Sequence, residues 1–155
     1  MEEKLFEQVY ETYGPSLYRF CLVRMGNRAD AEDVLQEVFC QRLFRAREFS
    51  SPERERRWLF QVVANQCRDE RKRRWRRDVP LDEQVLAQAP ETGDPALWEQ
   101  VARLPEKLRA VIHLYYGEGY DMKETAAILR ISVSAAKMRL KRGREALRSV
   151  WEADE

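Results

Sequence analysis

The chain has 155 residues, of which 44% are hydrophobic, which suits one ordinary domain or two small ones with a buried core. No signal peptide and no apolar run long enough to span a bilayer is visible, so we expect a soluble, cytoplasmic protein without membrane insertion. The net charge is +1, but basic and acidic residues are concentrated in different segments. Residues 53–77 contain ten bases and four acids, and residues 130–148 contain seven bases and one acid. Residues 78–129, between them, contain four bases and ten acids. Two basic blocks separated by an acidic one indicate two contacts with a polyanion.

Metal and thiol chemistry have little support in the composition. Cys21, Cys40 and Cys67 are the only cysteines, they are odd in number, and no pair has the CxxC spacing. We therefore expect free thiols in a reducing compartment. His113 is the only histidine, so a mixed Cys/His zinc site is not expected. We predict no metal, no cofactor and a structural role for His113.

The first 47 residues are predicted to form three helices, because no alternating β-branched run of useful length appears. An apolar stripe over residues 5–13 is interrupted at Gly14-Pro15. A second helix, with Pro15 in its first turn, continues from there to a stop at Gly26-Asn27. Asn27 can cap a third helix over about 29–47. The expected buried side of that third helix is Val34, Leu35, Val38, Phe39 and Leu43.

Residues 50–52 are predicted to be a loop and residues 53–76 a fourth helix, which carries the first basic block at its end. Leu59, Val62, Val63 and Cys67 are expected on its buried side. Residues three or four positions apart lie on the same face of a helix. One face of this helix therefore carries an aromatic ring, two amides and two cations, namely Trp58, Gln61, Asn65, Arg68 and Lys72. Such a face suits a nucleic-acid strand, since amides and cations reach phosphates or base edges and an aromatic ring stacks on an unpaired base. Each residue alone has a simpler explanation, as part of the core or as a solvated helix end.

The organisation predicted is two small helical domains, at residues 1–77 and 97–155, joined by a linker at 78–96. Residues 78–95 contain three prolines, one glycine, five acids and no base, which is typical of a linker. Apolar residues 97, 98, 101 and 104 begin the second domain, where Pro105 is expected at the first position of a helix that Gly117 and Gly119 end.

A helix-turn-helix is predicted near the C-terminus. Asp121 and Glu124 have the spacing of a capping box, and Ser132 can cap the following helix. The outer side of that second helix carries the candidate DNA-reading residues Ser134, Ala135, Lys137, Met138, Lys141 and Arg142. A cationic helix held by a short one matches the geometry that enters a DNA major groove. The alternative is a solvated basic helix packed on a core.

These pieces together resemble the extracytoplasmic-function (ECF) subfamily of bacterial RNA polymerase sigma factors. The run DAEDVLQEVF at residues 30–39 looks like the motif that binds core polymerase. The run WLFQVVAN at 58–65, followed by the arginine cluster, looks like the promoter-melting helix. Residues from 104 through the helix-turn-helix look like the second DNA-binding domain. The resemblance covers nearly the whole chain in the family's order.

The resemblance implies roles for particular residues. Asp33, Gln36 and Glu37 would face the clamp helices of the polymerase large subunit. Phe49 and the loop beginning at Ser50 would help to hold a flipped base of the minus-ten element, and Gln61 and Asn65 would lie near its upstream edge. The candidate residues between 134 and 142 would approach the minus-thirty-five element. The implied partners are core RNA polymerase, promoter DNA and, for regulation, an anti-sigma protein.

The sequence departs from the family pattern in three places. Ser50-Ser51 stand where members often have Arg-Gly. Arg130 stands in the turn of the helix-turn-helix where Gly is usual, and a left-handed conformation there costs on the order of 1 kcal/mol. Gly143 lies inside the recognition helix where Ala is common, at a cost of up to about 1 kcal/mol unless it permits close packing.

Two other classes of function compete with a sigma factor. A helix-turn-helix regulator that binds duplex operators as a dimer would leave the 58–77 helix and the 30–39 run without a task. An enzyme acting on DNA, such as a recombinase, would need a cluster of acids, or a Ser or Tyr with supporting Arg, on an α/β domain. No strands for such a domain are visible, so we predict a binding protein and not an enzyme.

Overall fold

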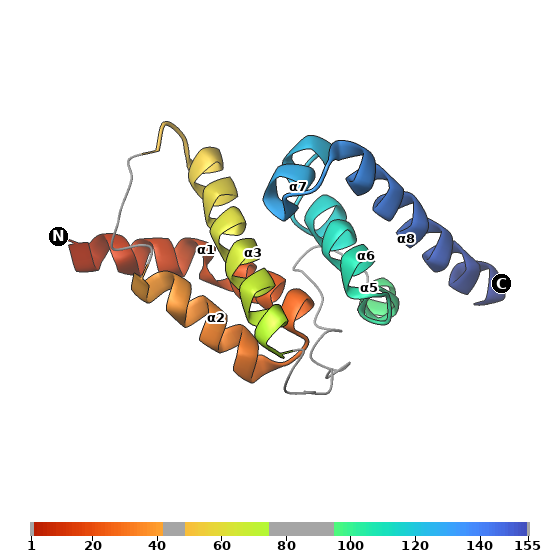
Figure 1. Ribbon diagram of the computed structural model, residues 1–155, viewed down its shortest axis with the longest axis horizontal. Helices are drawn as coiled ribbons and strands as arrows, with labels where there is room; N and C mark the ends of the chain where they lie inside the picture. The colour runs from red at the N-terminus through yellow and green to blue at the C-terminus, as the bar shows by residue number, and fades with distance from the viewer. Residues whose placement is uncertain (1, 42–48, 75–94, 155) are drawn as a thin grey trace. The chain divides into compact units, whose positions relative to one another are not determined.

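The computed structural model describes residues 2–41, 49–74 and 95–154, and all regular elements in these segments are helices (Figure 1). The all-α prediction is therefore confirmed. The chain divides into two units, Met1–Leu81 and Asp82–Glu155, each with its own core. The predicted linker at 78–96 and Leu43 of the third helix lie outside the described residues, apart from the last two positions of that linker.

The first unit consists of three helices that all pack on one another, α1 (Glu2–Met25), α2 (Arg28–Gln41) and α3 (Pro52–Arg74). Phe20 of α1 meets Phe60 of α3 edge to face, with ring centroids 5.5 Å apart. The described residues of α2 and α3 that were expected inside are all buried, namely Val34, Leu35, Val38, Phe39, Leu59, Val62, Val63 and Cys67. The helical spacing of apolar residues therefore located the core of this unit correctly.

The prediction of two helices before residue 26 is wrong, because α1 runs through Pro15 without a break. Proline cannot donate a hydrogen bond to the carbonyl of Glu11, and its ring crowds that carbonyl, which together cost about 3 kcal/mol or more. Packing on both sides of Pro15 offsets this cost. Tyr10 meets Phe39 of α2 with ring centroids 5.0 Å apart, and Leu17 is completely buried.

The end of α1 and the start of α2 are formed by Gly26 and Asn27, as the sequence predicts. The Asn27 side-chain oxygen accepts the backbone N–H of Asp30 at 2.9 Å and so caps α2. Gly26 has φ of 82°, which suits the left-handed residue that ends α1. Arg71 of α3 donates to the carbonyl of Arg24 at 2.8 Å, in the last turn of α1, and so ties the end of α1 to α3.

The second unit contains α5 (Pro95–Ala102), α6 (Glu106–Ile112), the π-helical turn η2 (His113–Gly117), α7 (Met122–Leu129) and α8 (Val133–Asp154). Pro105 is the N-cap of α6, one position before the expected one. The π turn was not predicted; it is marked by the Glu118 N–H, which donates to the His113 carbonyl five residues earlier at 3.0 Å. The long α8 lies against α6 and α7, so its inner face closes the core of this unit.

Candidate nucleic-acid interface

The helix-turn-helix is built from the caps that the sequence predicts. The Asp121 carboxylate accepts the N–H of Glu124 at 2.7 Å, and the Glu124 carboxylate accepts the N–H of Asp121 at 3.4 Å, which completes the capping box of α7. Arg130 ends α7 in the left-handed conformation, with φ 55° and ψ 47°. Ser132 then accepts the N–H of Ala135 at 3.0 Å and starts α8. The turn between the two helices is thus fixed at both ends.

Gly143 explains how α8 lies so close to α6. A Cβ built at this position would come within 2.9 Å of the Ile112 Cδ1 and 3.0 Å of its Cγ1, which is closer than carbon atoms normally approach. Ile112 is itself buried, as are Ala136, Leu140 and Leu147 on the same side of α8. The glycine therefore has the packing reason that a helix interior requires.

The opposite side of α8 presents the candidate DNA-reading residues. Ser134, Lys137, Met138, Lys141 and Arg142 are exposed, and Ala135 is half-buried. Met138 has 48% of its surface accessible, which is unusual for a large apolar side chain and suits contact with a base methyl group or sugar. The structure thus places the predicted set on one accessible helix face.

Arg144 extends this basic side and was missed in the sequence analysis, although it follows Lys137 and Lys141 at helical spacing. Its guanidinium donates to the Tyr116 hydroxyl at 2.6 Å and lies 5.5 Å from the Tyr116 ring centroid. Tyr116 belongs to the π turn, so the sequence alone gave no indication of this contact.

His113 has the structural role expected of it. It is buried, its Nε2 lies 3.0 Å from the Glu118 carboxylate, and its ring meets Trp98 edge to face at a centroid distance of 5.8 Å. These contacts join α5, the π turn and the segment that leads into α7. His113 therefore helps to hold the helix-turn-helix on the rest of its unit.

The five residues predicted to share one face of α3 all lie on this helix, and the aromatic residue among them contacts a second aromatic ring. Trp58, Gln61, Asn65 and Arg68 are half-buried and Lys72 is exposed, all on α3. The Trp58 ring lies 5.4 Å from the Phe49 ring, centroid to centroid and tilted by 48°. Arg68 donates to the Asn65 side-chain oxygen at 3.5 Å. Phe49 and Ser50 precede α3 directly, so the two aromatic rings form one cluster at its N-terminal end.

Part of the basic block on α3 is engaged within the protein. Arg71 holds the end of α1, as described above, and Arg73 pairs with Glu70 at 3.2 Å. Residues 75–77, which complete the block, lie outside the described residues. Fewer basic side chains of α3 are therefore available to a ligand than the number of basic residues in its sequence suggests.

The three α2 residues that the resemblance assigns to polymerase binding, Asp33, Gln36 and Glu37, form a stripe on one side of the helix. Asp33 and Gln36 are exposed and Glu37 is half-buried, whereas Val34 and Val38 face the core. Two acids and an amide on an accessible helix face suit a basic protein partner. Among the described residues, no group of three His, Cys, Asp or Glu side chains could hold a metal ion. None of the described helices is long and apolar enough to cross a membrane.

Comparison with known proteins identifies the family. The model for sigma-70 region 2 matches residues 9–77, and that for sigma-70 region 4 matches residues 95–147. The ECF RNA polymerase sigma factor SigL of Mycobacterium tuberculosis is 30% identical over 95% of this chain and 89% of its own length. SigW of Bacillus subtilis, also an ECF RNA polymerase sigma factor, is 29% identical over the same shares of the two chains.

The chain belongs to the ECF sigma factors. It is therefore a sigma factor that directs promoter-specific transcription, and the rival interpretation as an operator-binding regulator is not favoured. Sigma factors bind core RNA polymerase and are not enzymes in the catalytic sense. The family prediction made from the sequence is confirmed.

Two solved structures resemble this sigma factor over nearly the whole chain. The sigma factor RpoE from Bartonella quintana, in complex with the anti-sigma factor NepR, has a TM-score of 0.75 at 21% identity, covering 98% of this chain and 99% of the other. CnrH in complex with the cytosolic domain of CnrY has a TM-score of 0.65 at 27% identity, covering 99% and 91%. The first likeness, at 21% identity, supports the fold alone.

Proposed function

We propose that this sigma factor divides its work between a polymerase-binding and strand-opening domain at residues 1–77 and a duplex-reading domain at 97–155, joined by a linker at 78–96. The observation that carries the proposal is the presence of three separate accessible faces, on α2, α3 and α8, in the family's order along the chain. The protein acts by binding, in the cytoplasm, and the chemistry of RNA synthesis belongs to the polymerase.

The α2 stripe of Asp33, Gln36 and Glu37 contacts core polymerase. Its exposure supports this role, and its acidic character suits a basic helix on the partner. The core side of α2 is occupied by the apolar residues of the first unit, so the stripe is the face that remains for a partner.

The aromatic cluster and the α3 face act on the minus-ten element. Phe49, Ser50 and Trp58 take up an unpaired base, while Gln61, Asn65, Arg68 and Lys72 contact the strand beside it. Base stacking on an aromatic ring is worth roughly 1–3 kcal/mol. This is similar to the few kcal/mol needed to extrude a base from a duplex, so stacking can drive melting.

The outer face of α8 reads the minus-thirty-five element. Ser134, Ala135, Lys137 and Met138 lie in the first two turns of the helix, where a helix-turn-helix contacts base edges. Lys141 and Arg142 follow one turn later. Regulation by an anti-sigma protein is part of the proposal, because the structurally similar sigma factor RpoE is bound to the anti-sigma factor NepR.

Titration of core polymerase with a fluorescently labelled sigma factor tests the polymerase contact. Asp33→Ala combined with Glu37→Ala should weaken binding about tenfold or more, as expected when two central residues of an interface are truncated together. Circular dichroism should show an unchanged fold, because neither side chain is part of the core. Run-off transcription on a promoter library then gives the promoter. Unchanged affinity for core would contradict the assignment.

A further inference from the structure

A pocket of about 260 Å³ opens at the surface of the second unit, where α5, α6, the π turn and α8 meet. Most of the side chains that line it are apolar, namely Leu97, Trp98, Val101, Ile112 and Leu147. All of these except Leu97 are buried, so the pocket reaches the core of the unit. Protein interiors pack with few voids larger than a water molecule. A hollow of this size against the core is therefore space that an apolar ligand can fill.

The remaining lining residues place positive charge at the mouth of the pocket. They are Tyr116, Arg144 and Arg148, and all three are exposed. Arg144 and Arg148 are four residues apart on α8 and so project from the same side of the helix. Among the described residues, no acid lines the pocket and neither guanidinium pairs with a carboxylate. The pocket thus combines apolar walls with two cations whose charge an anion can neutralise.

Arg144 is held in place by the π turn. Its Nε–H donates to the Tyr116 hydroxyl at 2.6 Å. Its guanidinium carbon lies 5.5 Å from the centroid of the Tyr116 ring and 5.8 Å from that of the Tyr115 ring. The bond to Tyr116 uses Nε and leaves Nη1 and Nη2 for a second acceptor, and their paired N–H groups match the two oxygens of a carboxylate. An arginine that is already ordered by such contacts loses less side-chain entropy when it binds an anion.

Size and chemistry together limit what the pocket can accept. Sites for drug-sized ligands enclose about 300–1,000 Å³, so a ligand here must be smaller. Its body must be apolar, because a polar group placed against Trp98, Ile112 and Leu147 would lose its hydrogen bonds to water. Its charged end must be an anion that reaches Arg144 and Arg148 at the mouth. Inorganic phosphate has the charge but no apolar body, and an amine has the wrong charge. A small carboxylic acid with an aliphatic or aromatic body meets all of these conditions.

We propose that this pocket binds a small carboxylate, whose oxygens are held by Arg144 and Arg148 and whose aliphatic or aromatic body lies against the apolar walls. Such a ligand contacts α5, α6 and α8 at once and stabilises the packing between them. Ile112 is also the residue that Gly143 approaches, so the bound ligand lies next to the contact that fixes α8. The two arginines are outside the set proposed to read the minus-thirty-five element, and the site therefore adds small-molecule binding to the proposed functions.

Isothermal titration calorimetry of the full chain with straight-chain carboxylates tests the pocket. Butanoate, hexanoate and octanoate should bind progressively more tightly, by about fourfold for each methylene group that becomes buried. Octylamine has a body of the same length as octanoate and the opposite charge, so it should bind about tenfold more weakly or worse beside two guanidinium groups. Absence of saturable binding of octanoate, or equal affinity for octylamine, would overturn the proposal.

Arginine variants locate the carboxylate. Arg144→Gln and Arg148→Gln keep much of the apolar stem but lose the charge, and each should weaken octanoate binding about tenfold, as expected when hydrogen bonds between charged groups are lost. Octanol has no charge and should bind all forms alike. Lys123→Gln is the matched control, because it removes one positive charge from an exposed position of α7 that does not line the pocket. Unchanged affinity in both arginine variants, or an equal loss in Lys123→Gln, would overturn the site.

Trp98 reports on the body of the ligand. In a proton–nitrogen correlation spectrum, the indole N–H signal that is missing from Trp98→Phe should shift as octanoate saturates the protein, with the same affinity as in calorimetry. Trp58 belongs to the first unit, and its indole signal should stay in place. A shift of the Trp58 signal without a shift of the Trp98 signal would place the carboxylate elsewhere and overturn the proposal.

Discussion

The two surfaces proposed to meet DNA are built differently. On α8 the reading residues are exposed on one side of a helix whose other side is fixed by packing at Gly143 and by caps at Arg130 and Ser132. On α3 the corresponding side chains contact the protein itself: Trp58 packs on Phe49 and Arg68 bonds to Asn65. The α8 surface is therefore ready for a duplex that keeps its shape, whereas the α3 surface must exchange internal contacts for contacts with an unpaired strand.

The largest effect is expected from a substitution that disrupts the aromatic cluster of Phe49 and Trp58 beside α3. Phe49→Ala removes a stacking partner worth roughly 1–3 kcal/mol and should reduce open-complex formation about tenfold or more. Closed-complex binding should change little, because the upstream contacts belong to α8. Permanganate reactivity of promoter thymines, with holoenzyme on a duplex and on a pre-melted bubble, measures the effect. Trp58 is half-buried and loses its neighbour, so circular dichroism of the variant serves as the control for folding. Equal impairment on the two templates would show that Phe49 holds a flipped base without driving melting.

The next largest effect is expected for a substitution on the outer face of α8. Arg142→Ala should cost about 1–3 kcal/mol on the specific minus-thirty-five element and relax specificity there, as expected for a side chain that contacts a base. A side chain that contacts only phosphate would instead weaken binding to all sequences alike and lower the salt slope by about one. Titrations against specific and scrambled elements at several salt concentrations distinguish the two. Equal losses on both elements for Arg142→Ala would contradict its role in reading bases.

A smaller effect tests the rigid support of α8. Gly143→Ala gains up to about 1 kcal/mol of helix propensity but overpacks Ile112, which typically costs about 1–3 kcal/mol. We expect a net loss of about 1 kcal/mol in the free energy of unfolding. Ile112→Val removes the Cδ1 that lies 2.9 Å from the new Cβ, so the double variant should be more stable than the sum of the two single changes. Thermal unfolding of the four proteins measures this coupling, and strict additivity would show that the close approach does not limit packing.

The smallest effect concerns the turn before α8. Arg130→Gly relieves a left-handed arginine and should stabilise the second unit by up to about 1 kcal/mol. This corresponds to a rise of roughly 4–8 °C in the midpoint of thermal unfolding for a domain of this size. Arg130→Lys keeps the charge and the strained backbone and should leave the midpoint unchanged. An equal rise in both variants would assign the effect to the arginine side chain instead of to the backbone.

Local rules predicted most of the described helices. Asn27, Asp121 with Glu124, and Ser132 each mark a helix start by side-chain chemistry that involves only neighbouring residues, and all were identified correctly. Apolar spacing likewise found the buried sides of α2 and α3. The predicted candidate residues lie on the expected faces, while their roles remain proposals.

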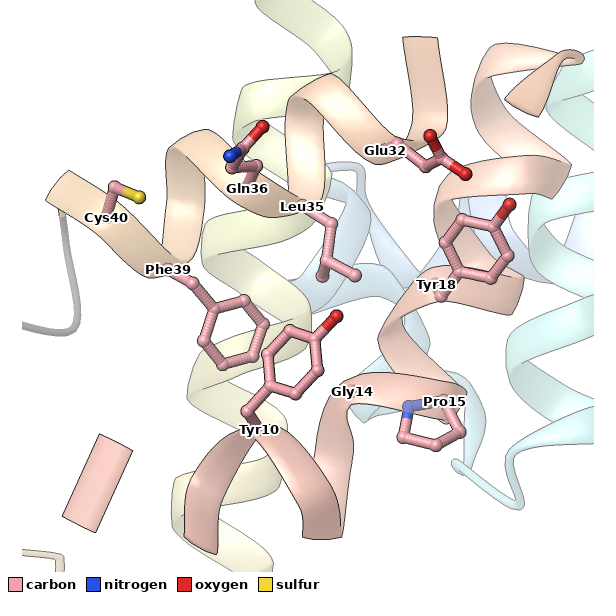
Figure 2. A pocket seen from close by; sticks show the side chains of 9 residues that line it. All are labelled: Tyr10, Gly14, Pro15, Tyr18, Glu32, Leu35, Gln36, Phe39 and Cys40. Carbon is pink, nitrogen blue, oxygen red and sulfur yellow. The ribbon is translucent and has the colours of Figure 1, made fainter. Parts of the chain in front are cut away.

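The failures arose where distant contacts decide the outcome. The cost of Pro15 is offset by Tyr10 against Phe39 and by the buried Leu17, and neither contact is visible in a local window. A groove between α1 and α2 has the same origin, because its walls come from residues 10–18 and 32–40 (Figure 2). The reason for Gly143 also lies on another helix, at Ile112. Arg71 was counted among the cations available to DNA, but it holds a carbonyl of α1.

The π turn at His113–Gly117 gives the second unit a place where the chain can lose one residue. A π turn holds one residue more than the same turn of α-helix, and each α-helical residue advances the helix by about 100°. Removal of one residue within the turn would return it to α-helical winding without lengthening or breaking either neighbouring helix. The apolar faces of α6 and α8 would then keep their register, because the change is absorbed between them. We therefore expect that deletion of a single residue within this turn leaves the recognition helix in place.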